Sequence, residues 1–270
     1  MSDSRILRRT ALVTGASRGI GKATAIVLAH RGFDVAVTAR TVHPGDPSSI
    51  SPETGASLPG SLDETCAAVE AAGARAIPIA MDLLDRESLA PAVAAAINGL
   101  GHLDVLVNNA IFVGAGGGSL FLDTSLDDLE KRVYGNLTAQ LHITQYALRH
   151  MVERGSGTIV NVTSGAGRVT PQKPAGRGGW ALGYAASKAG FHRIADMVAL
   201  EYGDRGIRAF NINPGFVATE RVLAAGAALE FVASQGVAPS VVGEAIAWLI
   251  DSDTPNGAYV QAQEIAGNLR

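Results

Sequence analysis

The sequence of 270 residues contains a single cysteine, Cys66, and few aromatic residues, because Phe, Trp and Tyr together make up only 5%. One cysteine can form neither an internal disulfide nor a cysteine-based metal cage. The six histidines show no metal-ligand spacing, so no metal site is predicted. A chain without disulfides is typical of a reducing compartment, and we expect a cytoplasmic protein.

Charge is scarce as well, since charged residues make up 17% and the formal net charge is −3. A slightly acidic chain lacks the basic excess that phosphate contacts require, so no nucleic-acid partner is expected. No apolar run approaches the ~18 residues of a membrane span. The first ten residues carry no apolar stretch of the kind found in secretory signals. We therefore expect no membrane association.

Short apolar runs, rich in β-branched residues, alternate with longer Ala-rich amphipathic stretches. The short runs are nearly continuous, as in strands buried on both faces. Strands are predicted at 10–14, 34–38, 75–80, 104–107, 158–162, 207–212 and 259–265. Helices are predicted at 19–30, 62–72, 86–99, 126–154, 184–202 and 241–250. This alternation predicts a single α/β domain over residues 1–270, with a doubly wound parallel β-sheet of the Rossmann type.

Two irregular stretches interrupt the alternation, at 41–61 and 165–183. The first is rich in Pro, Ser and Gly, which predicts a long loop. Most of that loop is interpreted as a surface insertion, although its start, directly after the second strand, could contact a ligand. The second stretch contains Trp180, for which simple packing and a substrate-facing position are both open.

A glycine-rich turn lies between the first strand and the first helix, where Gly15, Gly19 and Gly21 share the spacing Gly-x-x-x-Gly-x-Gly. Such a turn brings backbone close to a pyrophosphate, which the helix N-terminus then faces with unpaired N–H groups. The turn also contains Ser17, Arg18 and Ile20. The strand–turn–helix setting supports a dinucleotide site, although glycine also serves ordinary turns.

The end of the second strand predicts which dinucleotide binds. An acidic residue there would hold the ribose 2′-hydroxyl of NAD, whereas an arginine accommodates the 2′-phosphate of NADP. Here Arg40 and Thr41 follow the strand, and no acid is present. Arg18 supplies a second cation, although either arginine alone could be a solvated surface charge. The combination favours NADP(H) over NAD(H).

Tyr184 and Lys188 are four residues apart at the start of a predicted helix and so share one face of it. A nearby ammonium lowers the pKa of a phenol, which makes the pair a candidate general acid/base for carbonyl–alcohol interconversion. Ser164 follows the fifth predicted strand and could hydrogen-bond the reacting oxygen. Asn136 lies within the long helix 126–154, where it is either an exposed residue or the holder of a proton-relaying water.

These motifs together resemble the short-chain dehydrogenase/reductase family over nearly the whole chain. The resemblance rests on 14–21 (TGASRGIG), 82–83 (DL), 108–110 (NNA), Asn136, Ser164, the Tyr-x-x-x-Lys pair and 213–215 (NPG) with Thr219. It implies that Ser164 orients the substrate oxygen, Tyr184 transfers the proton, Lys188 holds the nicotinamide ribose, and Asn136 supports a water relay. It further implies cofactor contacts from Asp82, Leu83, Asn109, Ala110, Pro214, Gly215, Val217 and Thr219.

The chain departs from the family pattern at three places. Ile111 stands where Asn-Asn-Ala is usually followed by glycine, which puts the course of that loop and the access beside it in question. Ser164 and Tyr184 are 184 − 164 = 20 residues apart, more than is usual, and the loop 41–61 is also longer. The extra residues before Tyr184 are expected to bulge over the site without disturbing the strand and helix that carry the motif.

The leading functional hypothesis is an NADP(H)-dependent oxidoreductase that acts on a small apolar ketone or secondary alcohol. Residues 219–240, largely small and apolar, are expected to form a lid over the substrate. A nucleotide-binding sensor or scaffold without turnover is the alternative. A sugar-nucleotide epimerase is disfavoured because no separate substrate domain fits after residue 259. Apolar residues on more than one face of helices 126–154 and 184–202 indicate that these helices need a second packing partner. The family resemblance implies that they pair across a two-fold axis, giving a homodimer or homotetramer.

Overall fold

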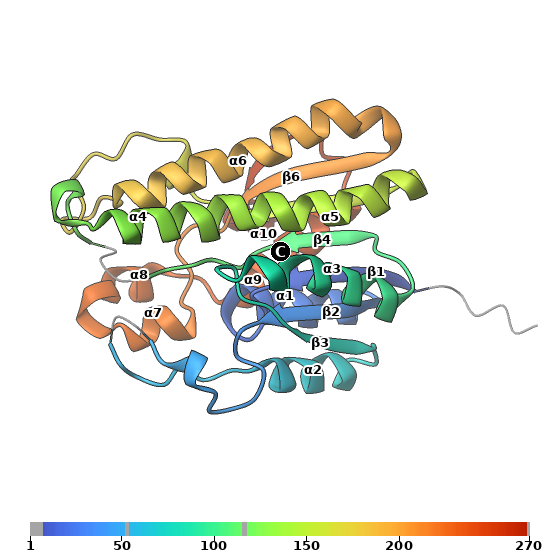
Figure 1. The fold of residues 1–270 in the computed structure, drawn as a ribbon, viewed down its shortest axis with the longest axis horizontal. Helices are drawn as coiled ribbons and strands as arrows, with labels where there is room; N and C mark the ends of the chain where they lie inside the picture. The colour runs from blue at the N-terminus through green and yellow to red at the C-terminus, as the bar shows by residue number, and fades with distance from the viewer. Residues whose placement is uncertain (1–7, 52–53, 115–117, 269–270) are drawn as a thin grey trace, which may run out of the picture.

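The computed structural model describes residues 8–51, 54–114 and 118–268. Its centre is a parallel sheet of seven strands in the order β3-β2-β1-β4-β5-β6-β7 (Figure 1). The strands are β1 (Arg9–Thr14), β2 (Phe33–Ala39), β3 (Ala76–Ala80), β4 (Val105–Asn108), β5 (Gly157–Val162), β6 (Ile207–Asn213) and β7 (Tyr259–Gln261). The central strands are buried almost throughout, which explains why their sequences are continuously apolar. The predicted α/β doubly wound parallel sheet is confirmed.

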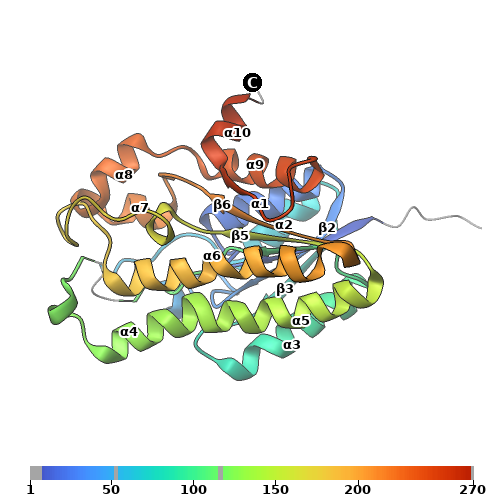
Figure 2. The same ribbon diagram turned by 90° about the horizontal axis from the view of Figure 1, so that it is seen from above.

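Helices cover both faces of the sheet in two layers (Figure 2). One layer holds α1 (Gly19–His30), α2 (Leu62–Ala71) and α9 (Pro239–Asp251). The other holds α3 (Arg86–Leu100), α5 (Ala139–Arg154) and α6 (Leu182–Tyr202), with α4 (Leu126–Val133) packed on α6. Each layer buries its own apolar cluster against the sheet, so the molecule has two cores with one sheet between them.

The strand order reverses between β1 and β4, because the chain winds outward from β1 in both directions. Ligands of open parallel sheets bind outside the carboxyl ends of the strands at such a switch point. The glycine turn after β1 and the loop after β4 meet there. This edge of the sheet is consequently where the fold predicts a cofactor.

The lid region after β6 consists of short helices rather than one long element. It contains α7 (Glu220–Ala224), a 3-10 turn (Gly226–Leu229) and α8 (Glu230–Gln235), and it ends where α9 begins at Pro239. Its two ends are joined by backbone hydrogen bonds, since Ala218 N donates to Val237 O at 2.9 Å and Val237 N donates to Phe216 O at 3.0 Å. The lid is thus an excursion that leaves the body and returns at the same place.

Two sequence predictions are corrected. The predicted helix 126–154 is interrupted by a π-helical turn, Tyr134–Thr138, which contains Asn136. The predicted last strand 259–265 is wrong beyond residue 261, because Ala262–Asn268 form the helix α10, which projects from the body in Figure 2. The strand β7 is short because it lies at the edge of the sheet, where its three residues pair with β6. Of the loop 41–61, residues 52–53 lie outside the described residues.

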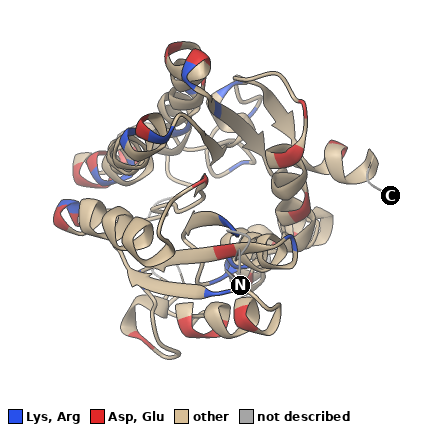
Figure 3. Ribbon diagram, turned by 90° about the vertical axis from the view of Figure 1, so that its right-hand side faces the viewer, with Lys and Arg blue, Asp and Glu red and all other residues tan. Residues whose placement is uncertain are grey.

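The side of the molecule that carries the amino ends of the strands has Lys and Arg interspersed with Asp and Glu (Figure 3). The described residues, with their mixed charge, form no basic stripe on that side. Among the described residues, no helix has both the length and the apolar character to cross a membrane. The described residues also contain no group of three or more His, Cys, Asp or Glu side chains that could hold a metal ion.

Candidate active site

A cavity lies at the switch point, between the glycine turn after β1, the end of β2, the loop after β4 and the lid. Eleven of the predicted cofactor residues line it: Gly15, Ser17, Arg18, Ile20, Arg40, Thr41, Asp82, Leu83, Asn109, Ala110 and Thr219. These residues come from segments that are far apart in the sequence. The sheet topology brings them to one place, as the doubly wound order predicts.

The glycine turn is packed too closely against its neighbours for side chains to be tolerated. Gly15 has a φ of +68°, and a Cβ there would lie 2.7 Å from the Cα of Ala110. The side chain of Asn109 ties the same turn to β4, since its Nδ2 donates to Thr14 O at 2.9 Å and to Gly15 O at 3.1 Å. Asn109 therefore shapes the cavity by holding the turn, and these two bonds engage its amide group.

The first N–H group of α1 has an anionic partner within the chain. Gly19 N donates to Glu220 Oε2 at 2.8 Å, and Glu220 is the first residue of the lid helix α7. Thr219, which precedes it, caps α7 by accepting a hydrogen bond from Val222 N at 3.4 Å. A helix N-terminus favours negative charge, so this contact shows that the turn accepts an anionic group at that position.

Three guanidinium groups, of Arg18, Arg40 and Arg221, line the same cavity. The pKa of Arg18 is lowered, first because burial disfavours its charge and then because the like charges of Arg221 and Arg40 are near. Glu220 opposes that shift in the pKa. Repulsion between these like charges destabilises the folded protein, and a bound anionic ligand would reduce that repulsion.

Ser164 and Tyr184 are brought together although 20 residues separate them in the sequence. Ser164 follows β5, and Tyr184 lies in the first turn of α6. Their side chains share a hydrogen bond, which acts to lower the pKa of the Tyr184 phenol. Burial acts more strongly in the opposite direction, so the pKa of Tyr184 is raised overall. Lys188 is not among the causes of this shift, contrary to the expectation that its ammonium lowers the Tyr184 pKa.

Lys188 lies on the same helical face and is buried, with 5% of its surface exposed. Its Nζ donates to the carbonyl oxygen of Val162 at 3.0 Å and lies 4.9 Å from the ring centroid of Phe191. Burial lowers the pKa of Lys188 to about 8. The residue is thus an ammonium held at the end of β5 by a backbone carbonyl, close to its titration point at neutral pH.

Asn136 is buried, with 2% of its surface exposed, so the interpretation as an exposed residue is wrong. Its Oδ1 accepts from Phe112 N at 2.7 Å, and its Nδ2 donates to Phe112 O at 3.0 Å. The side chain therefore fixes the loop after β4 at the residue that follows Ile111. The π-helical turn places Asn136 at this position, and π turns of this kind are frequent at functional sites.

The other predicted residues do not line this cavity: the four catalytic candidates Asn136, Ser164, Tyr184 and Lys188, and five of the cofactor candidates. Gly19 and Gly21 form the turn and the start of α1, while Pro214, Gly215 and Val217 form the segment from β6 to the lid. Gln263 of α10 holds this segment, since its Nε2 donates to Pro214 O at 3.2 Å and to Phe216 O at 3.1 Å. Sequence reasoning missed Gln263, because nothing in a polar residue near the end of the chain indicates which backbone it reaches.

Sequence reasoning also did not assign six residues that line the cavity: Ala39, Ser48, Met81, Ile111, Phe112 and Arg221. Two of them follow the Asn-Asn-Ala motif directly, and Ile111 had been noted only as a departure. Arg221 follows Thr219 closely, so the motif position was an available signal. No sequence signal marked Ser48, which belongs to the loop 41–61.

The chain matches the family model described as short chain dehydrogenase over residues 9–49 and 56–228. Among curated proteins it is 33% identical to a cyclohexanol dehydrogenase of Rhodococcus sp. (strain TK6), over 99% of this chain and 90% of that protein. It is 32% identical to a 3-oxoacyl-[acyl-carrier-protein] reductase of Synechocystis sp., over 97% and 87% of the two chains.

Among solved structures, the acetoin dehydrogenase of Enterobacter cloacae superposes with a TM-score of 0.74 at 31% identity, over 97% of this chain and 98% of that one. The match thus extends over the glycine turn, the strand ends and the helix that carries Tyr184 and Lys188. On these grounds the chain belongs to the short-chain dehydrogenase family and is a dehydrogenase/reductase built on a Rossmann fold.

Proposed function

We propose that the protein is an NADP(H)-dependent oxidoreductase that interconverts a carbonyl group and a secondary alcohol, with Tyr184 as the general acid/base. The single observation that carries the proposal is the constellation at the end of β5. There the Ser164–Tyr184 hydrogen bond lies next to a buried lysine on the same helical face. A protein that only binds nucleotides has no need of a buried ammonium beside a phenol.

The residues present fit a dinucleotide. The backbone of the glycine turn leaves no room for a Cβ at Gly15 or Gly21 and accepts an anionic group at Gly19. Asp82 and Leu83 would hold the adenine, and Arg18 and Arg40 the ribose phosphate. Lys188 and Thr219 would hold the nicotinamide half. When bound, the nicotinamide supplies or accepts the hydride.

The protein's own part in the reduction is proton delivery and positioning. The raised pKa keeps the Tyr184 phenol protonated at neutral pH, so it can donate its proton to the substrate carbonyl oxygen. The Ser164 hydroxyl would hydrogen-bond the same oxygen and fix its position. Lys188 uses one of its three donor hydrogens on Val162 O, which leaves the others for ribose hydroxyls and for returning a proton to the phenolate.

In this mechanism Asn136 is a positioning residue. Its amide exchanges two hydrogen bonds with the backbone of Phe112. A side-chain amide has two N–H hydrogens and two acceptor lone pairs, so the proposed relay water would use the remaining ones. Asn136 also fixes the loop that forms the cavity wall beside the reacting centre.

The surroundings of the site support an apolar substrate. Ile111 and Phe112 line the cavity, and the lid carries an edge-to-face pair of Phe216 and Phe231 whose ring centroids are 5.6 Å apart. Both phenyl rings are largely exposed, at 48% and 66%. Apolar residues that line a cavity favour an apolar ketone or alcohol over a charged one.

Oligomerisation is also part of the proposal. The outer faces of α4, α5 and α6 carry exposed apolar side chains, among them Leu126, Leu141, Met197 and Leu200, with exposures of 42–79%. Apolar faces of this kind mark an interface, and a two-fold axis across these helices would cover them. Light scattering should therefore show a dimer or tetramer, and Leu200→Glu should shift the distribution toward the 27.7 kDa monomer.

The experiment that tests the function is NADPH consumption with a panel of apolar ketones, repeated with NADH. Turnover with preference for NADPH is expected. Arg40→Asp should shift preference toward NADH, because it removes a phosphate partner and adds repulsion. Equal or tighter NADH binding by the parent protein would overturn the NADP assignment. Tight nucleotide binding with no turnover on any carbonyl or alcohol would favour the sensor.

A further inference from the structure

The segment 42–60, here called the insertion, has local structure of its own in its described residues, 42–51 and 54–60. Ile50 and Ser57 form an antiparallel bridge, and Ser51 N donates to Ala56 O at 2.8 Å. The carboxylate of Asp46 closes the first turn by accepting hydrogen bonds from Val42 N at 2.8 Å and His43 N at 2.9 Å. The insertion is therefore a structured unit rather than the tolerated surface loop that its composition suggests.

The insertion is docked on the glycine turn. Gly60 has a φ of +103°, and a Cβ there would collide with the carbonyl oxygen of Ser17, so only glycine allows this approach. Arg18 then reaches across the contact: its Nε donates to Pro59 O and its Nη2 to Gly60 O, both at 2.9 Å. Two carbonyl groups fix the direction of the guanidinium without neutralising its charge.

The insertion also contributes a hydroxyl to the cavity. Ser48 lines it together with Arg18, Arg40 and Thr41. The Thr41 hydroxyl oxygen accepts hydrogen bonds from Ser48 Oγ at 3.0 Å and from Arg18 Nη2 at 3.4 Å. Since the oxygen of Thr41 serves these donors, its own hydrogen remains for a ligand, and the hydroxyl of Ser48 can rotate toward one.

Two hydroxyls and two guanidinium groups at one end of a cavity are donors suited to a phosphate monoester. Among the described residues that line the cavity, the one acidic residue is Asp82. It follows β3, so the described part of the insertion contributes no carboxylate to the cavity lining that would repel a phosphate. The donor set lies directly after β2, where a dinucleotide fold places the adenosine ribose. The donor groups to which the insertion contributes are therefore suited to a phosphate on the adenosine ribose.

We propose that the insertion is a part of the cofactor site: it aims Arg18 and supplies Ser48 to a subsite that selects a phosphate monoester on the adenosine ribose. The proposal rests on the proposed function and extends it, because selectivity for the phosphorylated cofactor then depends on a segment outside the sheet. Ser48 is the new specificity-determining residue, and Gly60 is the position that lets the insertion dock.

Calorimetric titration with adenosine 2′,5′-bisphosphate and with 5′-ADP separates phosphate recognition from nucleotide recognition. Ser48→Ala should weaken the bisphosphate about 10- to 100-fold, since a hydrogen bond to a charged group is lost, and should leave 5′-ADP unchanged. Ser57→Ala is the matched control, because this exposed serine of the same insertion does not line the cavity. It should change neither affinity.

Gly60→Ala gives a second, independent test. It should undock the insertion from Ser17 and weaken the bisphosphate by at least as much as Ser48→Ala, with the thermal midpoint showing that the domain stays folded. An unchanged bisphosphate affinity in both variants overturns the proposal, as does equal weakening of both nucleotides. If the parent protein binds neither nucleotide, the proposed function itself fails. If Arg40→Asp abolishes bisphosphate selectivity while Ser48→Ala and Gly60→Ala both leave it intact, the role of the insertion is lost and the proposed function stands.

Discussion

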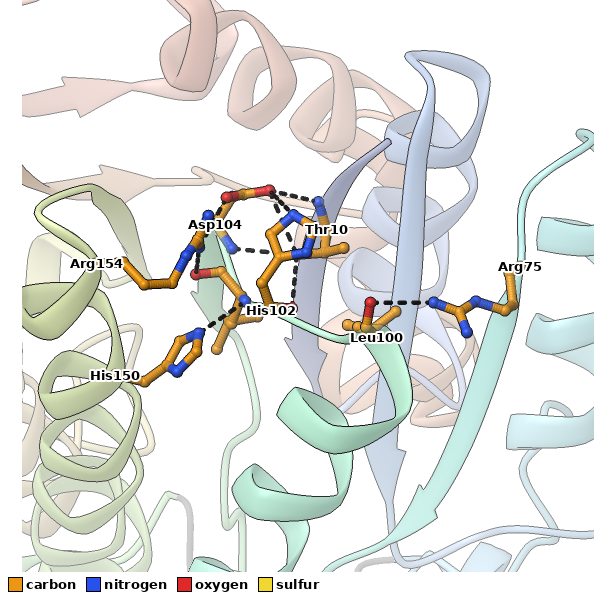
Figure 4. A network of polar contacts seen from close by, with 8 residues as sticks. Thr10, Arg75, Leu100, His102, Asp104, His150 and Arg154 are labelled. Carbon is orange, nitrogen blue, oxygen red and sulfur yellow. Dashed lines mark hydrogen bonds and ion pairs between the residues drawn. The ribbon is translucent and has the colours of Figure 1, made fainter. Parts of the chain in front are cut away.

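Charged side chains are paired differently at the two ends of the sheet. At the amino end, the carboxylate of Asp104 accepts from Thr10 N at 2.8 Å and pairs with His102 Nε2 and with Arg154 Nη1, both at 3.0 Å (Figure 4). At the carboxyl end, Lys188 is buried with a backbone carbonyl, and no carboxylate pairs with it among the described residues. The Asp104 network joins the starts of β1 and β4. Lys188, in contrast, is a charged group whose desolvation lowers the stability of the folded protein.

The amino-end network is closed by further bonds. Thr10 Oγ1 donates to His102 O at 2.8 Å, Arg154 Nη1 donates to Leu103 O at 3.1 Å, and Leu103 N donates to His150 Nε2 at 3.2 Å (Figure 4). These bonds tie the segment before β4 to β1 and to α5. The amino ends of the strands carry a network that stabilises the fold, and the carboxyl ends carry the proposed catalytic residues. Variants at each end can test this separation.

The largest expected effect is at the carboxyl end. Tyr184→Phe should lower kcat by about 10²–10⁴-fold, because the general acid is removed while the ring is kept. NADPH affinity and the thermal midpoint should stay close to those of the parent. Steady-state kinetics and calorimetry measure both. Tyr202→Phe, at the other end of the same helix, is the control and should leave turnover unchanged. Near-normal turnover in Tyr184→Phe would disprove the mechanism.

At the amino end, Asp104→Ala should lower the free energy of unfolding by about 2–3 kcal/mol, because charge-assisted hydrogen bonds are lost and the Thr10 N–H is left without its acceptor. Turnover at low temperature should persist, since the site lies at the opposite end. Urea denaturation gives the unfolding free energy. Asp127→Ala removes an exposed carboxylate from an i,i+4 pair and should change stability by less than about 1 kcal/mol. Equal effects of the two variants would contradict the comparison.

Lys188→Met should do the reverse of Asp104→Ala, abolishing turnover while raising the unfolding free energy by about 1 kcal/mol, because a buried charge is removed. The pH dependence sharpens this prediction. Between pH 8 and 10.5 the unfolded lysine keeps a proton that the folded lysine, with its pKa of about 8, has released. The contribution of Lys188 to the unfolding free energy of the parent should therefore rise with pH between 8 and 10.5, and Lys188→Met should lack this rise. A destabilised Lys188→Met protein would refute the argument.

The smallest effect concerns His150, whose pKa is lowered first by burial and then by the nearby Arg154. Its neutral ring accepts the Leu103 N–H, and protonation would end that bond. The folded pKa lies below the unfolded value of 6.5, so this contribution to stability is complete above pH 6.5 and decreases as the pH falls below it. His150→Gln cannot titrate, and its denaturation midpoint should change less between pH 7 and 5 than that of the parent.

The sequence alone predicted the parallel sheet, the glycine turn and the Ser164, Tyr184 and Lys188 set, and the structure brings these three together. These features depend on local patterns: continuous apolar strands, glycines at a strand–helix junction, and two residues on one helical face. The prediction failed at the last strand, where Ala262 and the residues after it form a helix. There the sequence at 259–265 (YVQAQEI) mixes apolar and polar residues, and so short a stretch does not tell a strand at a sheet edge from a helix packed on α9.

The fold and the candidate reacting groups could be predicted from the sequence, because hydrophobic periodicity and motif spacing are properties of neighbouring residues. The burial, the pKa shifts and the contacts of those groups follow from the tertiary structure. Burial raises the pKa of Tyr184 although a lysine lies four residues away, and Asn136 holds a loop rather than facing solvent. Likewise, Ser48 enters the cavity from a stretch that reads as surface loop. Desolvation and long-range packing depend on the whole fold, so no local pattern of residues can encode them.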